Sequence, residues 1–303
     1  MPSNASTTRG HPPAASFRAL CRDVRHGAGL AVHEPTLQAA AAEWPLLTAA
    51  LRQHAAGRRD AQVYDQPAAF EAFIRGGGNV PLYEQVSAEL AGQYAGVRSL
   101  LDIGCGDGHA LFPALAARPH GLERLTLLEP AAALLASALA RAQAEQPELP
   151  VQARHERLDA FAANLGAADR WDVAQATFAL QAIPEPERWD GLARLRGHAG
   201  RLVIVEFDIP DLQRDPDTLL LSLVGRYERA LGEYEGATRE LVALGFLLPM
   251  FLGQLDEQTA ATNWEHPAPV WRTRLERLGW RVRRLERLCD YFWSPAFVLV
   301  AEA

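Results

Sequence analysis

Near residue 100 the chain changes abruptly from an apolar strand pattern to a glycine-rich loop. Residues 97–103 carry four large apolar side chains, as a buried strand does. Glycines then stand at 104, 106 and 108, before a helical sequence begins. Because glycine has no Cβ, the backbone of such a loop can turn sharply and lie close to a ligand. We therefore expect a strand, a loop and a helix that together bind a nucleotide-like molecule.

The spacing of the glycines differs from that of a dinucleotide-binding loop. Such a loop reads G-x-G-x-x-G and places a pyrophosphate over the helix N-terminus. Here His109 stands at the position of the third glycine, and Gly108 comes one residue early. Asp102 at the strand tip would repel a pyrophosphate and attract a cation. A cationic ligand without phosphate is therefore favoured.

A second acidic residue ends the next expected strand, residues 125–129. Pro130 follows Glu129 and opens a helix rich in Ala and Leu. A carboxylate at this position can accept hydrogen bonds from both hydroxyls of a ribose, and NAD enzymes use the same device. An acid at a helix N-terminus is also favoured by the helix dipole alone. Glu129 thus supports an adenosine ligand without identifying which one.

Composition narrows the class of protein. The 303 residues suffice for one large domain or two small ones, and 49% of them are hydrophobic. The formal net charge of −7, without a long basic run, argues against nucleic acid as a partner. Cys21, Cys105 and Cys289 are too few and too dispersed for a disulfide framework or a zinc site. We expect no metal and a reducing, cytoplasmic location.

Two further features concern targeting and origin. No segment reaches the roughly 18 uninterrupted apolar residues of a membrane span. Residues 1–15 are polar and lack an apolar core, so we expect a disordered tail and no signal peptide. Frequent Ala, Arg, Gly and Pro suggest a bacterial gene of high GC content.

Strands and helices alternate through the centre of the chain, which indicates a parallel sheet. We expect strands at 98–102, 125–129, 151–156, 171–177 and 201–206, and helices between them. Runs at 281–288 and 296–301 are spaced like a hairpin. The predicted organisation is a tail (1–15), an N-terminal helical cap (16–95), a core (96–210), a helical lid or insert that binds the acceptor (211–280) and a C-terminal hairpin of the core sheet (281–303).

The sequence from Asp102 to Gly108, Asp-x-Gly-x-Gly-x-Gly, resembles the first motif of class I S-adenosylmethionine-dependent methyltransferases. The resemblance covers residues 97–210 well and the final hairpin by position. It implies an α/β, Rossmann-like sheet of seven strands, five parallel and two in an antiparallel C-terminal hairpin, flanked by helices. It also implies S-adenosylmethionine as cofactor and S-adenosylhomocysteine as product. The cofactor-binding residues that it suggests are Tyr64, Arg75, Asp102, Gly104, Cys105, Gly106, Glu129, Pro130, Leu158, Asp159, Ala176 and Thr177.

The residues at the tip of the fourth expected strand indicate which class of acceptor is methylated. Family members that methylate amino groups of nucleic acids carry Asn- or Asp-Pro-Pro-aromatic at its tip, whereas this chain has Gln175 to Phe178. A small acceptor is therefore favoured. Many small-molecule relatives place a His where Gln181 stands, and Gln cannot act as a base. The expected acceptor-binding residues are Tyr83, Phe178, Gln181, Tyr227, Met250, Trp264, Tyr291 and Trp293.

Two side chains are candidates for catalysis. Glu206 ends the apolar run of the fifth strand and could orient the acceptor or act as a base if burial raises its pKa. His266 lies in a polar and aromatic segment, although a lone His is more often structural.

The resemblance predicts a metal-independent transfer of a methyl group to O, N or C of a small aromatic or hydrophobic specialised metabolite. An NAD-dependent oxidoreductase, a non-catalytic S-adenosylmethionine-binding module and an aminopropyl transferase are the alternatives. No nucleic acid or membrane partner is expected, and the N-terminal helices offer a surface through which a homodimer could form.

Overall fold

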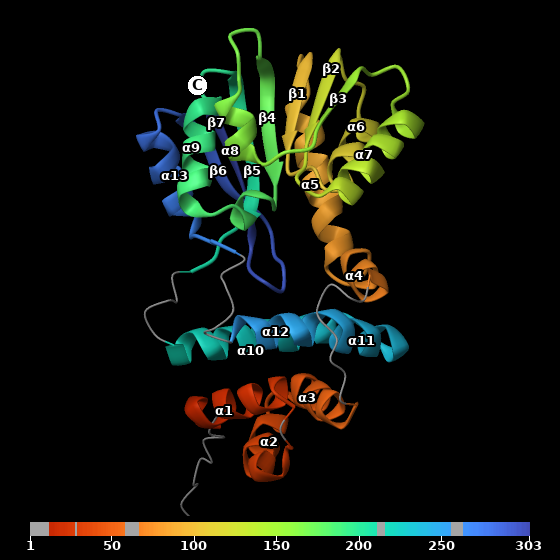
Figure 1. Ribbon diagram of the computed structural model, residues 1–303, viewed down its shortest axis with the longest axis vertical. Coiled ribbons are helices and arrows are strands. Elements are labelled where there is room, and N and C mark those ends of the chain that lie inside the picture. The colour runs from red at the N-terminus through yellow and green to blue at the C-terminus, as the bar shows by residue number, and fades with distance from the viewer. Residues whose placement is uncertain (1–11, 28, 58–66, 211–215, 256–262) are drawn as a thin grey trace, which may run out of the picture. The chain divides into compact units, whose positions relative to one another are not determined.

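The computed structural model describes residues 12–27, 29–57, 67–210, 216–255 and 263–303. The chain divides into two compact units (Figure 1). The sheet unit comprises Pro81–Asp211 and Ala261–Ala303, and the helical unit comprises Met1–Val80 and Leu212–Ala260.

The sheet unit contains a seven-stranded sheet in the order β3-β2-β1-β4-β5-β7-β6. The first five strands of this order pair in parallel, and β7 runs antiparallel to both β5 and β6. This arrangement confirms the predicted parallel sheet completed by an antiparallel C-terminal hairpin. The strands are β1 (Ser99–Ile103), β2 (Arg124–Leu128), β3 (Val151–Arg154), β4 (Trp171–Thr177), β5 (Ala199–Phe207), β6 (Arg281–Cys289) and β7 (Ala296–Glu302).

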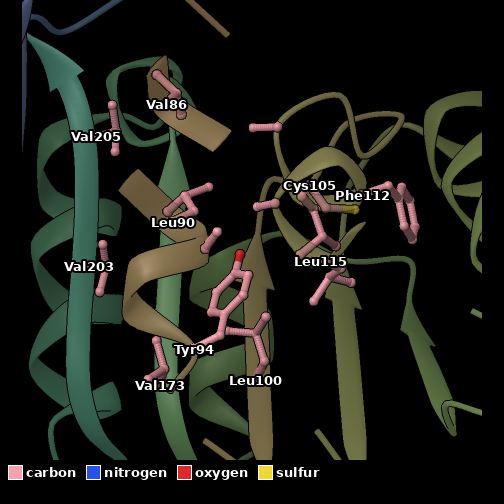
Figure 2. Packing of buried hydrophobic residues seen from close by; sticks show 14 of the residues in the cluster. Val86, Leu90, Tyr94, Leu100, Cys105, Phe112, Leu115, Val173, Val203 and Val205 are labelled. Atoms are coloured by element: carbon pink, nitrogen blue, oxygen red, sulfur yellow. The ribbon is translucent and has the colours of Figure 1, made fainter. Parts of the chain in front are cut away.

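Helices cover both faces of the sheet, which is why its central strands are apolar on both sides. Figure 2 shows Val86, Leu90 and Tyr94 packed beside strand residues such as Val203. That face carries α5 (Asn79–Gln93), α6 (Leu111–Ala117) and α7 (Ala132–Glu145). On the other face Trp271 and other apolar side chains pack from α8 (Leu158–Ala163), α9 (Glu185–Leu195) and α13 (Ala268–Arg277).

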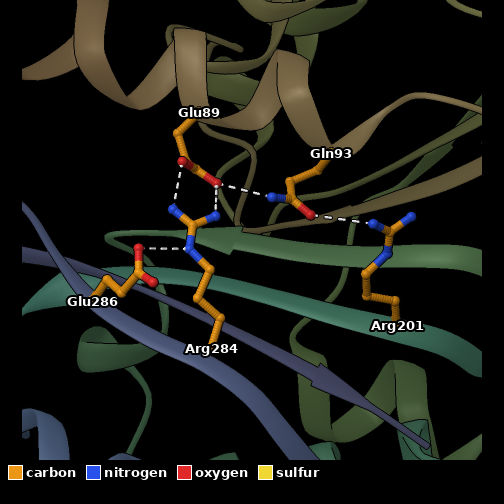
Figure 3. Close-up of polar contacts among 5 residues, drawn as sticks. All are labelled: Glu89, Gln93, Arg201, Arg284 and Glu286. Carbon is orange, nitrogen blue, oxygen red and sulfur yellow. Dashed lines mark hydrogen bonds and ion pairs between the residues drawn. The ribbon is translucent and has the colours of Figure 1, made fainter.

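A polar network connects α5 to the antiparallel edge of the sheet (Figure 3). Arg284 on β6 donates to both carboxylate oxygens of Glu89, at 2.6 and 2.8 Å. Gln93 Nε2 donates to Glu89 Oε1 at 2.8 Å, and Arg201 Nη1 donates to Gln93 Oε1 at 3.2 Å. The network pairs the partly buried charges of Glu89 and Arg284 and gives Arg201 a hydrogen-bond acceptor.

The boundary between the units differs from the expected domain limits. Residues 81–95 were expected in the cap and the described residues 263–280 in the lid, yet both pack in the sheet unit. Leu82 and Leu90 are buried on one face of the sheet, and Trp271 and Leu275 on the other. The apolar face of each amphipathic helix is buried against the sheet.

The helical unit consists of α1 (Ala14–Arg25), α2 (Glu34–Ala41), α3 (Pro45–Gly57), α4 (Pro67–Ile74), α10 (Pro216–Gly232), α11 (Gly236–Val242) and α12 (Leu248–Gln254). A π-helical turn, Ala243–Leu247, joins the last two. Of the expected tail, residues 1–11 lie outside the described residues, and Ala14 already begins α1, in which Phe17 is 1% exposed. Within the described residues, one stretch, Gly236–Gln254, is apolar and long enough to cross a membrane. Of its most apolar 18 residues, 44% are buried inside the protein, and a core helix of a soluble protein can be equally long and apolar.

The triple glycine between α4 and α5, residues 76–78, is a closely packed turn. Gly78 N donates to Glu233 Oε2 at 2.9 Å. A Cβ on Gly77, whose φ is 51°, would lie 2.8 Å from Tyr234 Cζ. The glycines therefore allow α10 and its C-terminal turn to approach the α4–α5 turn.

Candidate active site

The glycine loop after β1 adopts a backbone that glycine takes most easily. Gly104, Gly106 and Gly108 have φ values of 64°, 55° and 77°, in the left-handed region. A Cβ on Gly104 would lie 2.4 Å from Ala179 Cβ, and one on Gly108 would lie 2.2 Å from the Phe112 ring. A Cβ on Gly106 would meet nothing within 4 Å. Two of these glycines thus permit close packing, and Gly106 borders open space.

The side chain of Glu129, at the end of β2, is hydrogen-bonded to this loop. Its side chain is buried, with Oε2 accepting a hydrogen bond from Gly106 N at 3.0 Å and Oε1 one from Ala131 N at 2.8 Å. A carboxylate offers about four lone-pair sites, so both oxygens keep capacity for a ligand. Glu129 can therefore hold the loop and bind the hydroxyls of a ribose at the same time.

Asp102, in β1, is 4% exposed. Burial raises the pKa of its carboxyl to about 7, and the Glu129 carboxylate adds to the rise, while the Gln175 amide opposes it. A negative charge is costly in such a place unless a positive charge lies nearby. The site accordingly favours a cationic ligand.

These residues surround a cavity of about 350 Å³ at the carboxyl ends of the parallel strands. Ligands of open α/β sheets bind at this edge. The structure brings together there ten of the residues singled out from the sequence: Tyr83, Asp102, Gly104, Cys105, Gly106, Glu129, Pro130, Leu158, Thr177 and Phe178.

Sequence reasoning missed several lining residues. Asp107 lies inside the glycine motif and His109 directly follows it, and this position was the available signal. No comparable signal marks Ala182 and Ile183, which reach the cavity from the turn after β4. The missed residues are Ile103, Asp107, His109, Ala110, Leu111, Leu128, Leu134, Glu156, Arg157, Ala179, Ala182 and Ile183.

Phe178 stands at the tip of β4 in a strained conformation. Its φ is 51°, and no other non-glycine residue in the described ranges has a positive φ. Its ring stacks on Phe207 at 4.4 Å, and Phe207 stacks on Tyr291 at 5.2 Å, measured between ring centroids. Tyr83 meets Phe178 edge-on at 5.9 Å. The left-handed backbone costs about 1–2 kcal/mol, and it occurs where the Phe178 ring joins an aromatic stack beside the cavity.

Glu206, an expected catalytic residue, does not line the cavity. It is 1% exposed, and its Oε1 accepts hydrogen bonds from the backbone N–H groups of Leu180 at 2.9 Å and Gln181 at 3.2 Å. Burial raises its pKa to about 8. Side chains alternate along β5, so Glu206 and Phe207 point to opposite faces, and Phe207 is the one that reaches the aromatic stack. Glu206 thus holds the turn after β4.

His266 also lies outside the cavity lining. Its Nε2 is 3.2 Å from Glu185 Oε1, and its ring lies 6.3 Å from the rings of both Trp189 and Trp271. Burial lowers its pKa, which the Glu185 carboxylate partly opposes. The imidazole packs among aromatic rings on the α9 and α13 face of the sheet.

The remaining candidates of the sheet unit take part in other contacts. Asp159 Oδ1 accepts a hydrogen bond from Arg157 Nε at 3.2 Å, and Trp264 N donates to Gln181 O at 2.7 Å. Trp293 Nε1 donates to Glu265 Oε1 at 2.7 Å. Besides Glu206 and His266, the candidates in this unit that do not line the cavity are Asp159, Ala176, Gln181, Trp264, Tyr291 and Trp293. Ala176 is fully buried within β4, where its side chain points into the α8 and α9 layer.

Three candidates belong to the helical unit. Arg75 Nε lies 3.4 Å from Glu71 Oε1, in an exposed ion pair. Tyr227 donates from its hydroxyl to Gln254 Oε1 at 3.2 Å, and Met250 is half-buried in α12. Tyr64 lies outside the described residues.

Comparison with known proteins agrees with this geometry. Residues 101–200 match a protein family described as a methyltransferase domain. Magnesium protoporphyrin IX methyltransferase from Synechocystis PCC 6803, solved with bound S-adenosylhomocysteine, shares the fold with a TM-score of 0.51 and 17% identity over 80% of this chain and 97% of its own. A protein of the O-methyltransferase family from Burkholderia thailandensis also has a TM-score of 0.51, with 16% identity over 86% of this chain and 67% of its own. None of the curated proteins compared with the sequence matches it.

Proposed function

We propose that the cavity binds S-adenosylmethionine as methyl donor and that the acceptor is a small aromatic molecule. The proposal is supported by the match of residues 101–200 to a methyltransferase domain and by a fold similar to that of a methyltransferase solved with S-adenosylhomocysteine. The observation that carries the proposal is the meeting of Asp102, Gly106 and Glu129 around one cavity at the carboxyl ends of β1 and β2.

The polar groups of the cavity suit the donor. Glu129 has free acceptor capacity for the ribose hydroxyls, and Gly106 leaves space for a ligand against the backbone. Asp102 in its charged form complements the ammonium and sulfonium groups of the donor. The donor carries no phosphate, which agrees with the acidic residues at these two strand tips.

Methyl transfer from a sulfonium is an in-line displacement with a neutral leaving group, so alignment of the reactants contributes most of what a protein supplies. Phe178 and Tyr83 form one wall of the cavity and can orient an acceptor ring and exclude water. Neither Glu206 nor His266 reaches this wall, so a base from the fifth strand or from the lid is not part of the proposal.

A planar acceptor is supported by the stack of Phe178, Phe207 and Tyr291, since aromatic rings prefer offset or edge-to-face partners. The tip of β4 also lacks the Pro-Pro sequence of the nucleic-acid amino-methylating enzymes. The proposal also includes a role in the specialised metabolism of a bacterium, which is supported by the resemblance to small-molecule methyltransferases and by the composition of the chain.

Calorimetric titration of S-adenosylmethionine tests donor binding. Wild type and Glu148→Ala, which removes an exposed carboxylate outside the cavity lining, are expected to bind equally. Glu129→Ala is expected to bind at least about tenfold more weakly, since a charge-assisted hydrogen bond contributes about 1.5–3 kcal/mol. Equal affinity of Glu129→Ala, or tighter binding of NADH than of S-adenosylmethionine by wild type, contradicts the proposal.

The acceptor is identified by incubating the protein with a metabolite extract and S-adenosylmethionine labelled in its methyl group. Mass spectrometry is expected to find the label in a small aromatic product. Donor binding without any labelled product would instead support a non-catalytic binding module.

A further inference from the structure

A row of buried polar side chains connects the end of α5 with the cavity. The Tyr94 hydroxyl donates to Gln175 Oε1 at 2.9 Å, and Figure 2 shows the Tyr94 ring beside Leu100 among apolar side chains. Gln175 on β4 is paired in register with Asp102 on β1. Neighbours in register point to the same face of a sheet. Tyr94, Gln175 and Asp102 thus form one row, and only Asp102 among them lines the cavity.

The amide of Gln175 has an unused donor. The residue is 1% exposed, and its Nε2 makes no hydrogen bond of normal geometry with any residue in the described ranges. Leaving a buried donor without a partner costs about 1–3 kcal/mol. The amide nevertheless lowers the pKa of Asp102, because a donor stabilises a carboxylate. Nε2 is therefore placed to donate to Asp102 when that side chain is charged.

Three ionisable groups beside Asp102 in the described part of the chain bring no positive charge. They are Tyr94 after α5, Cys105 in the glycine loop and Glu129 at the end of β2. Asp107, His109, Glu156 and Arg157 also line the cavity, so its wall carries groups of both signs. A cationic ligand next to Asp102 would favour the charged form of its carboxyl group.

We propose that Asp102 carries a proton in the ligand-free protein and releases it to solvent when S-adenosylmethionine binds, and that Gln175, held by Tyr94, positions the resulting carboxylate. The inference rests on the proposed donor binding. The ligand keeps its own protons, and its positive charge offsets the cost of charging Asp102 in a buried site. Gln175 and Tyr94 are positioning residues, since they act through Asp102.

Titration calorimetry of the full chain with S-adenosylhomocysteine, which keeps the ammonium group and cannot react, tests this. Measurements from about pH 5.5 to 8.5, in pairs of buffers with different heats of ionisation, count the protons released on binding. Wild type is expected to release up to about one proton below pH 7 and none well above it, in line with the pKa of Asp102 of about 7. Asp102→Asn is expected to release none.

Gln175→Leu isolates the positioning role. The pH range of proton release is expected to move upward by about one unit, which corresponds to a tenfold change in proton affinity. Tyr94→Phe is expected to shift it in the same direction by less. The matched control is Gln93→Leu, the same change on α5 at a residue that binds Glu89 and lies outside the cavity lining; it leaves the profile unchanged.

Proton release by Asp102→Asn equal to that of wild type overturns the inference, and so does an unchanged profile in Gln175→Leu. Should Asp102→Asn fail to fold, the profile of Gln175→Leu decides alone. Binding without proton release refutes this inference only, whereas failure of wild type to bind S-adenosylhomocysteine refutes the proposed donor site and this inference with it.

Discussion

Replacing Gly106 by alanine separates the contribution of the glycine loop to stability from its contribution to binding. Gly106 has a φ of 55°, so an added Cβ brings a backbone penalty of about 1–2 kcal/mol. Apart from the chain neighbours of Gly106, no atom of the described residues lies within 4 Å of that Cβ, so no steric clash adds to this. We expect the free energy of unfolding to fall by about 1–2 kcal/mol, with the fold retained.

The effect on binding has a different origin. Gly106 lines the cavity, and its N–H is held by Glu129 Oε2 at 3.0 Å. The new methyl group would therefore occupy space that a ligand needs for close approach to the loop. We expect at least tenfold weaker binding of S-adenosylhomocysteine, which corresponds to a loss of about 1.4 kcal/mol or more.

Gly96→Ala is the matched control. Gly96 has a φ of 71° and also meets nothing within 4 Å of an added Cβ, but it stands in an exposed turn before β1 and does not line the cavity. Urea unfolding is expected to show a similar loss of stability in the two variants, and calorimetry a loss of affinity only in Gly106→Ala. Wild-type affinity in Gly106→Ala, or an equal loss in both, would refute the reasoning.

Three further changes test the fold around the site. Gly108→Ala places a Cβ 2.2 Å from a ring carbon in addition to its left-handed φ of 77°, so urea unfolding should show a larger loss of stability than in Gly106→Ala; an equal loss contradicts the packing argument. Glu206→Gln keeps an oxygen that can accept from the two backbone N–H groups and removes the titratable carboxyl group. In wild type the pKa of Glu206 is about 8 in the folded protein and 4.5 in the unfolded chain, so between these pH values the folded protein holds a proton that the unfolded chain has lost. The free energy of unfolding of wild type should therefore fall by up to about 1.4 kcal/mol per pH unit from pH 4.5 to 8. If the free energies of unfolding of variant and wild type depend on pH in the same way over this range, the raised pKa of Glu206 is contradicted. Arg284→Met leaves the partly buried Glu89 without its bidentate partner and should lower the free energy of unfolding by about 1–3 kcal/mol. Arg283→Met removes an exposed ion pair and should lower it by less than about 1 kcal/mol. Similar losses for both variants in thermal unfolding would contradict the view that burial sets the strength of these ion pairs.

The parallel sheet was predictable because its elements are local and strongly patterned. Apolar runs such as those of β1 and β5 are bounded by glycine, proline or acidic residues, and the alternation with helices implies the crossover connections. The unit to which α5 and α13 belong could not be predicted in this way. That depends on which apolar surface is available to cover them, as the burial of Leu82 and Trp271 against the sheet illustrates.

The face of the sheet to which a side chain at a strand end points depends on the register of the strand, and a shift of one residue moves the side chain to the other face. Glu206 and Phe207 are neighbours, yet the first holds a turn on one face and the second joins the aromatic stack on the other. Apolar or acidic character at a strand end does not distinguish these outcomes. The two catalytic candidates consequently fell outside the cavity lining, and His109 inside it was missed.

The sequence by itself determined which residues meet at the proposed donor end of the cavity. Asp102, the glycine loop and Glu129 each end or follow a strand, and parallel strands bring their carboxyl ends to one edge whatever packs around them. Only the tertiary structure decided the arrangement of the aromatic rings at the cavity, because the strained Phe178, its stack with Phe207 and Tyr291, and the approach of Tyr83 arise from contacts between segments far apart in the chain.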